Sequence, residues 1–209
     1  MKHIFILIFL SLTLSIYSQT GPGGIGNSSD NVIWLNGDIV TLGTNPNISA
    51  WPDQSGNGND FTQGTSTKQP VKVNYSNFSS VRFDGGDWVT NNGIAALNGN
   101  TNSQFIVYNG SIPNHKGILF EGSFTESSEF IRTFRSTAGD VLSWVFDSSS
   151  GVIFNTTTNS SAFQMITSVW DGTAETFDSY KNGTLFGSQS GADGNTSGNY
   201  KNTIGAASN

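Results

Sequence analysis

The sequence predicts an all-β protein built as a two-sheet antiparallel sandwich or jelly roll. From Val32 onwards, short runs rich in Val, Ile, Phe, Tyr, Trp and Thr alternate with clusters of Gly, Asn, Ser and Asp. Apolar residues almost nowhere keep the 3.6-residue spacing of a helix over three turns. Many short strands separated by turns are typical of sandwiches and jelly rolls, so we expect nearly all regular structure to be β.

The runs divide the chain into short expected strands and one short helix. A helix is predicted over 94–97, where Ala95 and Ala96 lie between two Asn-Gly breaks. The expected strands cover 32–35, 50–52, 60–62, 71–75, 81–84, 88–90, 104–108, 117–121, 129–135, 141–146, 152–155, 163–170, 176–181, 184–188 and 201–205.

Two of these segments allow a sharper prediction. Asn182-Gly183 accepts the positive φ angles of a two-residue type I′ turn, which places Tyr180 opposite Leu185 across a hairpin. In the run 141–146, alternation puts apolar residues on both faces of the strand, so this strand is expected inside a sheet rather than at its edge.

The N-terminus predicts export from the cell. Residues 1–18 combine Lys2 and His3 with an apolar run from Ile4, as in a secretory signal peptide, and we place cleavage between Ser18 and Gln19. The run is shorter than the roughly 20 apolar residues that span a bilayer, so no transmembrane segment is expected. Residues 19–31 read as a flexible glycine-rich leader and 32–209 as one domain of a secreted or cell-surface protein.

Charge and cysteine content narrow the class of partner. Without residues 1–18 the chain has eight Lys and Arg against fifteen Asp and Glu, a net charge of −7. Nucleic acid is therefore not expected as a partner, because phosphate binding needs a basic surface. There is no Cys, so stability has to come from a core, from ions or from neighbouring domains.

An ordered set of motifs resembles a known family. WLNGD at 34–38, WPDQSGNGND at 51–60, QPVKV at 69–73 and VRFDGGDW at 81–88 are followed by SVWDG at 168–172 and YKNG at 180–183. The set resembles the laminin-G-like domains of secreted and surface-attached bacterial proteins, which are concanavalin A-like jelly rolls. The resemblance implies two curved antiparallel sheets, a bound calcium ion in many members, a binding or adhesive role, and further domains in a longer chain. It also implies a final strand after 203–205, which this sequence lacks.

The loop after Trp51 is the candidate calcium site. Asp53, Ser55, Asn57 and Gly58 match the first, third, fifth and sixth positions of a calcium loop, but the twelfth position is Gly64 instead of a bidentate Glu. The same residues are also ordinary turn chemistry, and both interpretations stay open. If Ca²⁺ binds, Asp53 and Asn57 are the expected ligands, with Asp84 and Asp87 as partner carboxylates.

Three functions are consistent with these features. The first is a non-catalytic module that binds carbohydrate or a surface glycan; the five Trp residues are candidates for sugar contact, although core packing is the default for Trp on strands. The second is a glycoside hydrolase, which needs two positioned carboxylates. No Glu is followed two residues later by Asp, and the mature chain has one His. The third is a structural spacer in an adhesin. We expect no catalysis.

Overall fold

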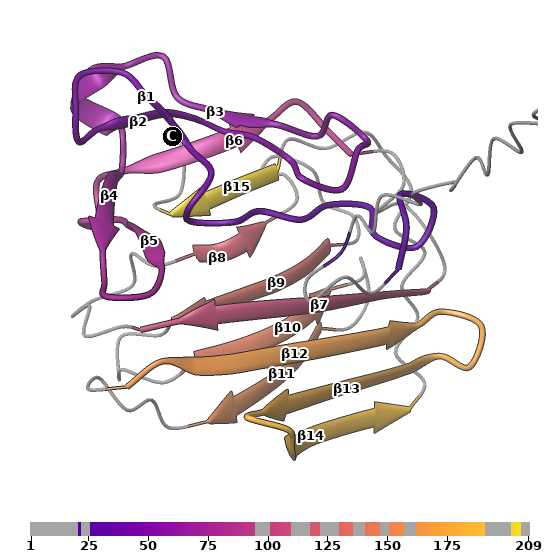
Figure 1. The fold of residues 1–209 in the computed structure, drawn as a ribbon. Helices are drawn as coiled ribbons and strands as arrows, with labels where there is room; N and C mark the ends of the chain where they lie inside the picture. Colours follow the sequence, from indigo (N-terminus) through magenta and orange to yellow (C-terminus); the bar gives the residue numbers. More distant parts are fainter. Residues whose placement is uncertain are drawn as a thin grey trace, which may run out of the picture.

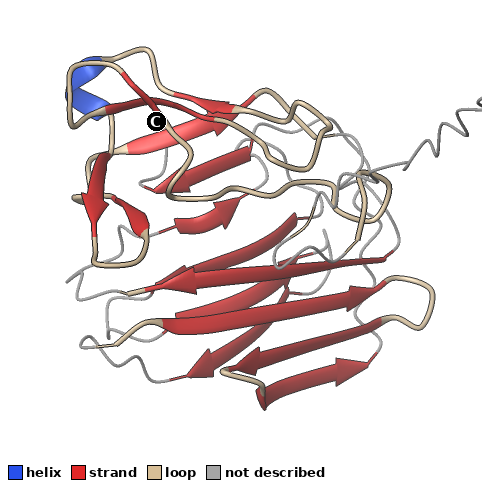
Figure 2. Ribbon diagram, viewed as in Figure 1, coloured by secondary structure: helices blue, strands red, loops and turns tan. Residues whose placement is uncertain are grey.

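The computed structural model describes residues 21, 26–94, 101–109, 118–121, 130–135, 141–146, 151–156, 162–190 and 202–205. These residues form an all-β fold with one 3₁₀ turn, η2 (Ser66–Lys68), as Figures 1 and 2 show. The described part has no helix long and apolar enough to cross a membrane. The predicted helix at 94–97 falls almost entirely outside the described residues.

The largest sheet has nine strands in the order β1-β2-β3-β6-β15-β8-β9-β10-β11, all paired antiparallel. β10 lies between β9 and β11, which confirms the prediction that residues 141–146 form an inner strand. The bounds are β1 (Thr41–Leu42), β2 (Ile48–Trp51), β3 (Phe61–Thr62), β6 (Trp88–Asn91), β8 (Ile118–Glu121), β9 (Phe130–Arg135), β10 (Val141–Phe146), β11 (Gly151–Thr156) and β15 (Asn202–Gly205).

A second sheet of four strands faces the lower half of the first. Its order is β14-β13-β12-β7, and the strands lie in front of β9, β10 and β11 in Figure 1. The bounds are β7 (Thr101–Tyr108), β12 (Gln164–Asp171), β13 (Thr176–Lys181) and β14 (Thr184–Ser190). This pair of layers is the predicted two-sheet antiparallel sandwich. A separate hairpin of β4 (Val71–Asn74) and β5 (Ser79–Arg82) adds a two-stranded sheet that was not predicted as such.

The hairpin at Asn182-Gly183 is confirmed. Asn182 and Gly183 have φ angles of 49° and 80°, and Tyr180 pairs with Leu185. Both positive angles suit the Asn-Gly pair, because neither residue pays the steric cost of a branched side chain there.

The upper half of the nine-stranded sheet carries its own core. Phe61, Val89 and Ile94 are buried there, and partly buried residues of the N-terminal segment and neighbouring strands pack against them: Val32, Ile33, Leu35, Trp51, Phe83 and Ile204. Residues 32–35 were expected as a strand, yet only a single bridge forms, between Leu35 and Asp53. The segment instead crosses the sheet as a covering loop.

The last described strand, β15, pairs with β6 on one side and β8 on the other. A further strand beyond it stays a prediction. Two apolar residues are exposed at the β1 edge of this sheet: Leu42 of β1 at 39%, and Ile39, which precedes β1, at 43%.

Candidate functional site

The two faces of the four-stranded sheet differ sharply. Alternation along β12 buries Ile166 and Trp170 against the nine-stranded sheet, with Phe177 of β13 beside Trp170. Tyr108 and Phe186 pack with Ile166 in the same interior, and the Tyr108 hydroxyl donates to Gln164 Oε1 at 3.1 Å. We call this side the inner face.

The residues of opposite parity form the outer face. Strand pairing arranges them in rows across β7, β12, β13 and β14. One row joins Phe105, Thr167, Tyr180 and Leu185, and its neighbour joins Val107 to Met165; two further rows are Ser103, Val169, Asp178 and Ser188, and Thr101, Asp171, Thr176 and Ser190. The outer face therefore has an apolar half and a half of hydroxyl and carboxyl groups.

The apolar half is open to solvent. Phe105 is 68% exposed, Val107 66% and Leu185 51%. Together with Tyr75, Phe78 and Phe163, these make six of the eight large hydrophobic residues that are exposed in the described part of the chain. Exposed apolar residues are common singly, but a contiguous group of them marks an interaction surface.

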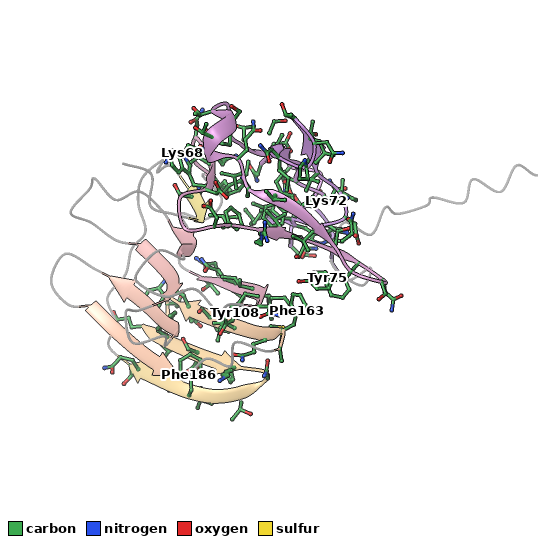
Figure 3. The ribbon with its side chains drawn as sticks, turned by 90° about the vertical axis from the view of Figure 1, so that its left-hand side faces the viewer. Lys68, Lys72, Tyr75, Tyr108, Phe163 and Phe186 are labelled. Atoms are coloured by element: carbon green, nitrogen blue, oxygen red, sulfur yellow. The ribbon has the colours of Figure 1, made fainter. Side chains whose placement is uncertain are left out.

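Three aromatic rings extend this surface at one corner. Tyr75 and Phe78 stack with their ring centroids 4.9 Å apart, at the tip of the β4–β5 hairpin. Phe163 meets both edge-on, with centroids 5.4 and 5.3 Å away. Since Phe163 directly precedes β12 with the parity of Met165, the cluster adjoins the outer face. Figure 3 shows Tyr75 and Phe163 side by side, with Tyr108 and Phe186 towards the interior.

The hairpin that carries Tyr75 and Phe78 is held to the loop before β1. Lys72 Nζ donates to the carbonyl oxygen of Asp38 at 2.9 Å, and the Ser79 N–H donates to Asp38 Oδ1. The Tyr75 N–H also donates to the Phe78 carbonyl at 2.8 Å, which closes the turn between the two rings. The position of the aromatic cluster is therefore fixed by backbone and side-chain hydrogen bonds.

At the opposite corner, Asp171 is held by the turn between β12 and β13. Its Oδ1 accepts the N–H groups of Thr173 and Ala174 at 2.9 and 3.0 Å, and the Thr101 hydroxyl at 3.4 Å. These hydrogen bonds, chiefly those from Ala174 and Thr173, lower the pKa of the Asp171 carboxyl. The polar half of the outer face thus keeps a fixed negative charge.

The predicted metal residues fall into two groups. In the first, Asp53 organises the loop that follows β2: its Oδ1 accepts from the N–H groups of Trp34 and Ser55, both at 2.9 Å. Its Oδ2 accepts from the Ser55 hydroxyl at 2.6 Å and the Asn59 N–H at 3.0 Å. Both carboxylate oxygens of Asp53 therefore accept hydrogen bonds from the protein itself, and these bonds hold the loop in place.

Asn57 lies where oxygens converge in this loop. Its Nδ2 donates to the carbonyls of Ser28 and Asn31, each at 2.9 Å, and of Val32 at 3.3 Å, and it lies 3.2 Å from Ser55 Oγ. Calcium takes six to eight oxygen ligands. These four oxygens suit a cation, but only if the Asn57 amide turns to present its own oxygen in place of the nitrogen.

The second group is a tight turn that contains Asp84 and Asp87. Asp84 Oδ1 accepts from the Gly86 N–H at 2.7 Å, and Asp87 Oδ2 accepts from the Asp84 N–H at 3.2 Å. Asp87 is buried, and this burial raises the pKa of its carboxyl, with the nearby Asp84 charge adding to the effect. Within 26–94, no hydrogen bond joins this turn to Asp53 or Asn57, and the described residues include no group of three acidic, His or Cys side chains placed to share a metal.

Three of the five Trp residues proposed for sugar contact, Trp51, Trp88 and Trp170, make contacts within the protein. Trp170 is buried, and Trp51 packs on the upper core while its Nε1 donates to the Asn36 carbonyl at 2.9 Å. Lys68 Nζ covers Trp88 at 5.2 Å from the ring centroid. Among the described residues, the large exposed aromatics are Phe and Tyr residues, which the sequence did not single out. The side chain of Trp144 lies outside the described part.

Neither the protein-family models nor the curated proteins give a match to this chain. Among solved structures, domain 4 of AbnA, an extracellular GH43 arabinanase from Geobacillus stearothermophilus in complex with arabinotriose, superposes with a TM-score of 0.57. The match has 14% identity and covers 74% of this chain and 77% of that domain. This likeness shows the fold: the chain is a concanavalin A-like jelly roll, as the resemblance to laminin-G-like domains predicted.

Two more distant matches have lower scores. Domains LG4-5 of the mouse laminin alpha1 chain give a TM-score of 0.45 at 11% identity, over 58% of this chain and 32% of that one. The Bacillus licheniformis beta-glucanase gives 0.41 at 10% identity, over 70% of each chain.

Proposed function

We propose that this chain is a non-catalytic carbohydrate-binding module of a secreted or cell-surface protein, and that it binds glycan on the outer face of the four-stranded sheet. The observation that carries the proposal is the inverted pattern of β7. Asn102 and Gln104 point inwards, where Asn102 Oδ1 and Gln104 Oε1 are buried without a hydrogen-bond partner, while Phe105 and Val107 point into solvent. A one-residue change of register would reverse this arrangement. A pattern that goes against burial is expected at functional surfaces.

The chemistry of the outer face suits a sugar better than a purely apolar partner. A sugar ring has C–H groups on its faces and hydroxyls at its rim. The exposed side chains of Phe105, Val107 and Leu185 offer apolar contact, and the adjoining rows of Ser, Thr and Asp offer hydrogen-bond partners. The arabinanase domain of similar fold is described in complex with arabinotriose, which is consistent with this ligand class.

The alternative that deserves a direct test is hydrolysis, because Asp171 and Asp178 share the outer face. Asp171 pairs with Thr176, and Asp178 lies two residues further along β13, so the two carboxyls are diagonal neighbours. Diagonal neighbours are about 7–8 Å apart, a separation that suits an inverting glycosidase. A catalytic acid needs a raised pKa, however, and the pKa of Asp171 is lowered. The raised pKa belongs to Asp87, which lies in the turn before β6 of the other sheet.

Affinity gel electrophoresis with a panel of neutral and acidic polysaccharides tests the proposal. We expect at least one polysaccharide to retard the wild-type protein. Phe105→Ala should weaken that binding by about tenfold, because truncating an exposed aromatic anchor typically costs more than 1 kcal/mol of binding energy. Ile39→Ala is the matched control, since Ile39 is an exposed apolar residue near the edge of the other sheet.

Three outcomes would contradict the proposal. Absence of retardation on every polysaccharide would favour a spacer. A dimer in gel filtration that Phe105→Ala dissociates would assign the outer face to a second copy of the chain. Release of reducing ends that stops in Asp178→Asn would make the protein an enzyme.

A further inference from the structure

The charge on the outer face has one sign. Asp171 and Asp178 lie within it, and Glu175 is in the turn that joins their strands. The outward residues of the four described strands include no Lys or Arg: they are Thr101, Ser103, Phe105, Val107, Met165, Thr167, Val169, Asp171, Thr176, Asp178, Tyr180, Leu185, Ser188 and Ser190. A ligand on this face meets carboxylates, and none of the outward residues of these described strands supplies a compensating cation.

The two Asp residues lie at different places on the face. Asp178 is between Val169 and Ser188 in its row, two residues from Tyr180, so it adjoins the apolar half. Asp171 is at the far end of the polar half, and its hydrogen bonds to Thr173 and Ala174 keep its carboxylate in place. A glycan long enough to cross both halves passes both charges.

The described cations that could neutralise these charges are directed elsewhere. Lys72 Nζ donates to the Asp38 carbonyl, and Lys68 lies over Trp88 of the nine-stranded sheet. Lys181 pairs with the buried Ile166 and has the parity of the inner face. Within the described part of the chain, where Arg82 belongs to the β4–β5 hairpin, no base is therefore shown to balance the acidic outer face.

We infer that the outer face selects uncharged glycans and excludes glycans that carry carboxylate or sulfate groups. The inference rests on the proposed function and names the ligand class of the same face. A carboxylate on the ligand would approach Asp178 or Asp171 with no cation among the outward residues of the described strands to offset the repulsion, whereas neutral hydroxyls can donate to these carboxylates. For each ligand charge that comes within about 5 Å of one Asp, repulsion at the dielectric constant of bulk water should weaken binding by about threefold to fivefold.

The test compares one polymer in two charge states. The neutral polysaccharide that retards the protein most is partly carboxymethylated, and binding of both forms is measured by affinity electrophoresis at about 0.15 M salt. We expect the wild-type protein to bind the carboxymethylated form at least fivefold more weakly. Asp178→Asn should reduce this preference to about twofold. Adding salt to about 1 M, where the screening length falls to about 3 Å, should have the same effect.

Asp60→Asn separates a local charge from the overall negative charge of the chain. Asp60 is exposed in the loop between β2 and β3, and its Oδ1 accepts the Asp53 N–H, a bond that the Asn amide oxygen can keep. This variant loses the same charge and should retain the wild-type preference. Equal loss of preference in both variants, or equal binding of the two polymer forms by the wild-type protein, would overturn the inference. No binding to any neutral or acidic polymer would instead overturn the proposed function itself.

Discussion

The loop around Asp53 and the outer face of the four-stranded sheet both have the composition of a binding site. They differ in whether their side chains already have partners within the protein. In the loop, both oxygens of Asp53 and the amide nitrogen of Asn57 are engaged by groups of the same chain. On the outer face, Phe105, Val107 and Leu185 remain more than half exposed. A dense set of polar residues can therefore be structural, whereas side chains without partners in the protein indicate function.

The largest expected effect tests the structural role of the loop. Asp53→Ala removes the acceptor of four hydrogen bonds, from Trp34, Ser55 (through both its N–H and its hydroxyl) and Asn59. Bonds to a charged acceptor contribute about 1.5–3 kcal/mol each and are not additive, so we expect a loss of about 3 kcal/mol in the free energy of unfolding. Urea unfolding measures it.

Phe105→Ala is the counterpart on the outer face. Because Phe105 is 68% exposed, its truncation should change the free energy of unfolding by less than about 0.5 kcal/mol. A larger loss from Phe105→Ala than from Asp53→Ala would reverse the roles assigned to the two regions. The comparison needs no knowledge of the ligand.

The sequence predicted the fold because turn chemistry and β-rich runs agree over most of the chain. Residues 141–146 and 176–181 form strands with the predicted bounds, and Asn182-Gly183 forms the predicted turn. The segment 32–35 was not a strand, because its apolar side chains cover the core formed by Phe61, Val89 and Ile94 instead of pairing. An apolar run of four residues looks the same in both situations.

The exposed apolar surface of the outer face could not be predicted, because β7 contains apolar and polar residues at both parities. In Thr101–Tyr108, Ile106 and Tyr108 share the inner parity with Asn102 and Gln104, while Phe105 and Val107 have the outer parity. Only the pairing with β12 decides which set is exposed. The burial of Trp170 could not be predicted for the same reason, since strand position decides whether an aromatic ring is buried.

A smaller effect on stability is expected from calcium. Adding calcium tests whether the loop around Asp53 can bind an ion in addition to its structural role. We predict that calcium raises the melting temperature of chelator-treated protein. Extracellular calcium sites have dissociation constants of about 10⁻⁴–10⁻³ M, so about 1 mM calcium should stabilise the fold by about 0.4–1.4 kcal/mol. This corresponds to roughly 1–5 °C for a domain of this size.

Asn57→Asp sharpens the calcium test. Without calcium, a carboxylate among the carbonyls of Ser28, Asn31 and Val32 should lower the melting temperature, because the three bonds from Nδ2 are lost and the carboxylate faces the partial negative charges of the carbonyl oxygens. With calcium, the same oxygens become ligands and the loss should be recovered. If calcium shifts neither the wild-type protein nor this variant, the loop is structural alone.

The smallest expected effect is the contrast between two carboxyls, that of Asp87 in the turn before β6 and that of Asp171 on the outer face. Burial raises the pKa of Asp87 in the folded state, so the folded protein binds this proton more tightly than the unfolded chain does. The ionised Asp87 therefore costs stability at neutral pH, and the cost disappears as the pH falls below the unfolded pKa of about 3.9. Asp87→Asn should raise the melting temperature at pH 7 and leave it unchanged near pH 3.

Asp171 should show the opposite sign. Its lowered pKa means that the ionised form stabilises the fold above the unfolded pKa, and that this contribution is lost as the pH falls through the lower folded value. Asp171→Asn should therefore lower the melting temperature slightly at pH 7, and the difference should vanish in strong acid. Melting curves of both variants between pH 3 and pH 7 measure the two slopes. If Asp87→Asn lowers the melting temperature at pH 7 only when calcium is present, the Asp84–Asp87 turn is a metal ligand, and the cost of burial is offset by the ion.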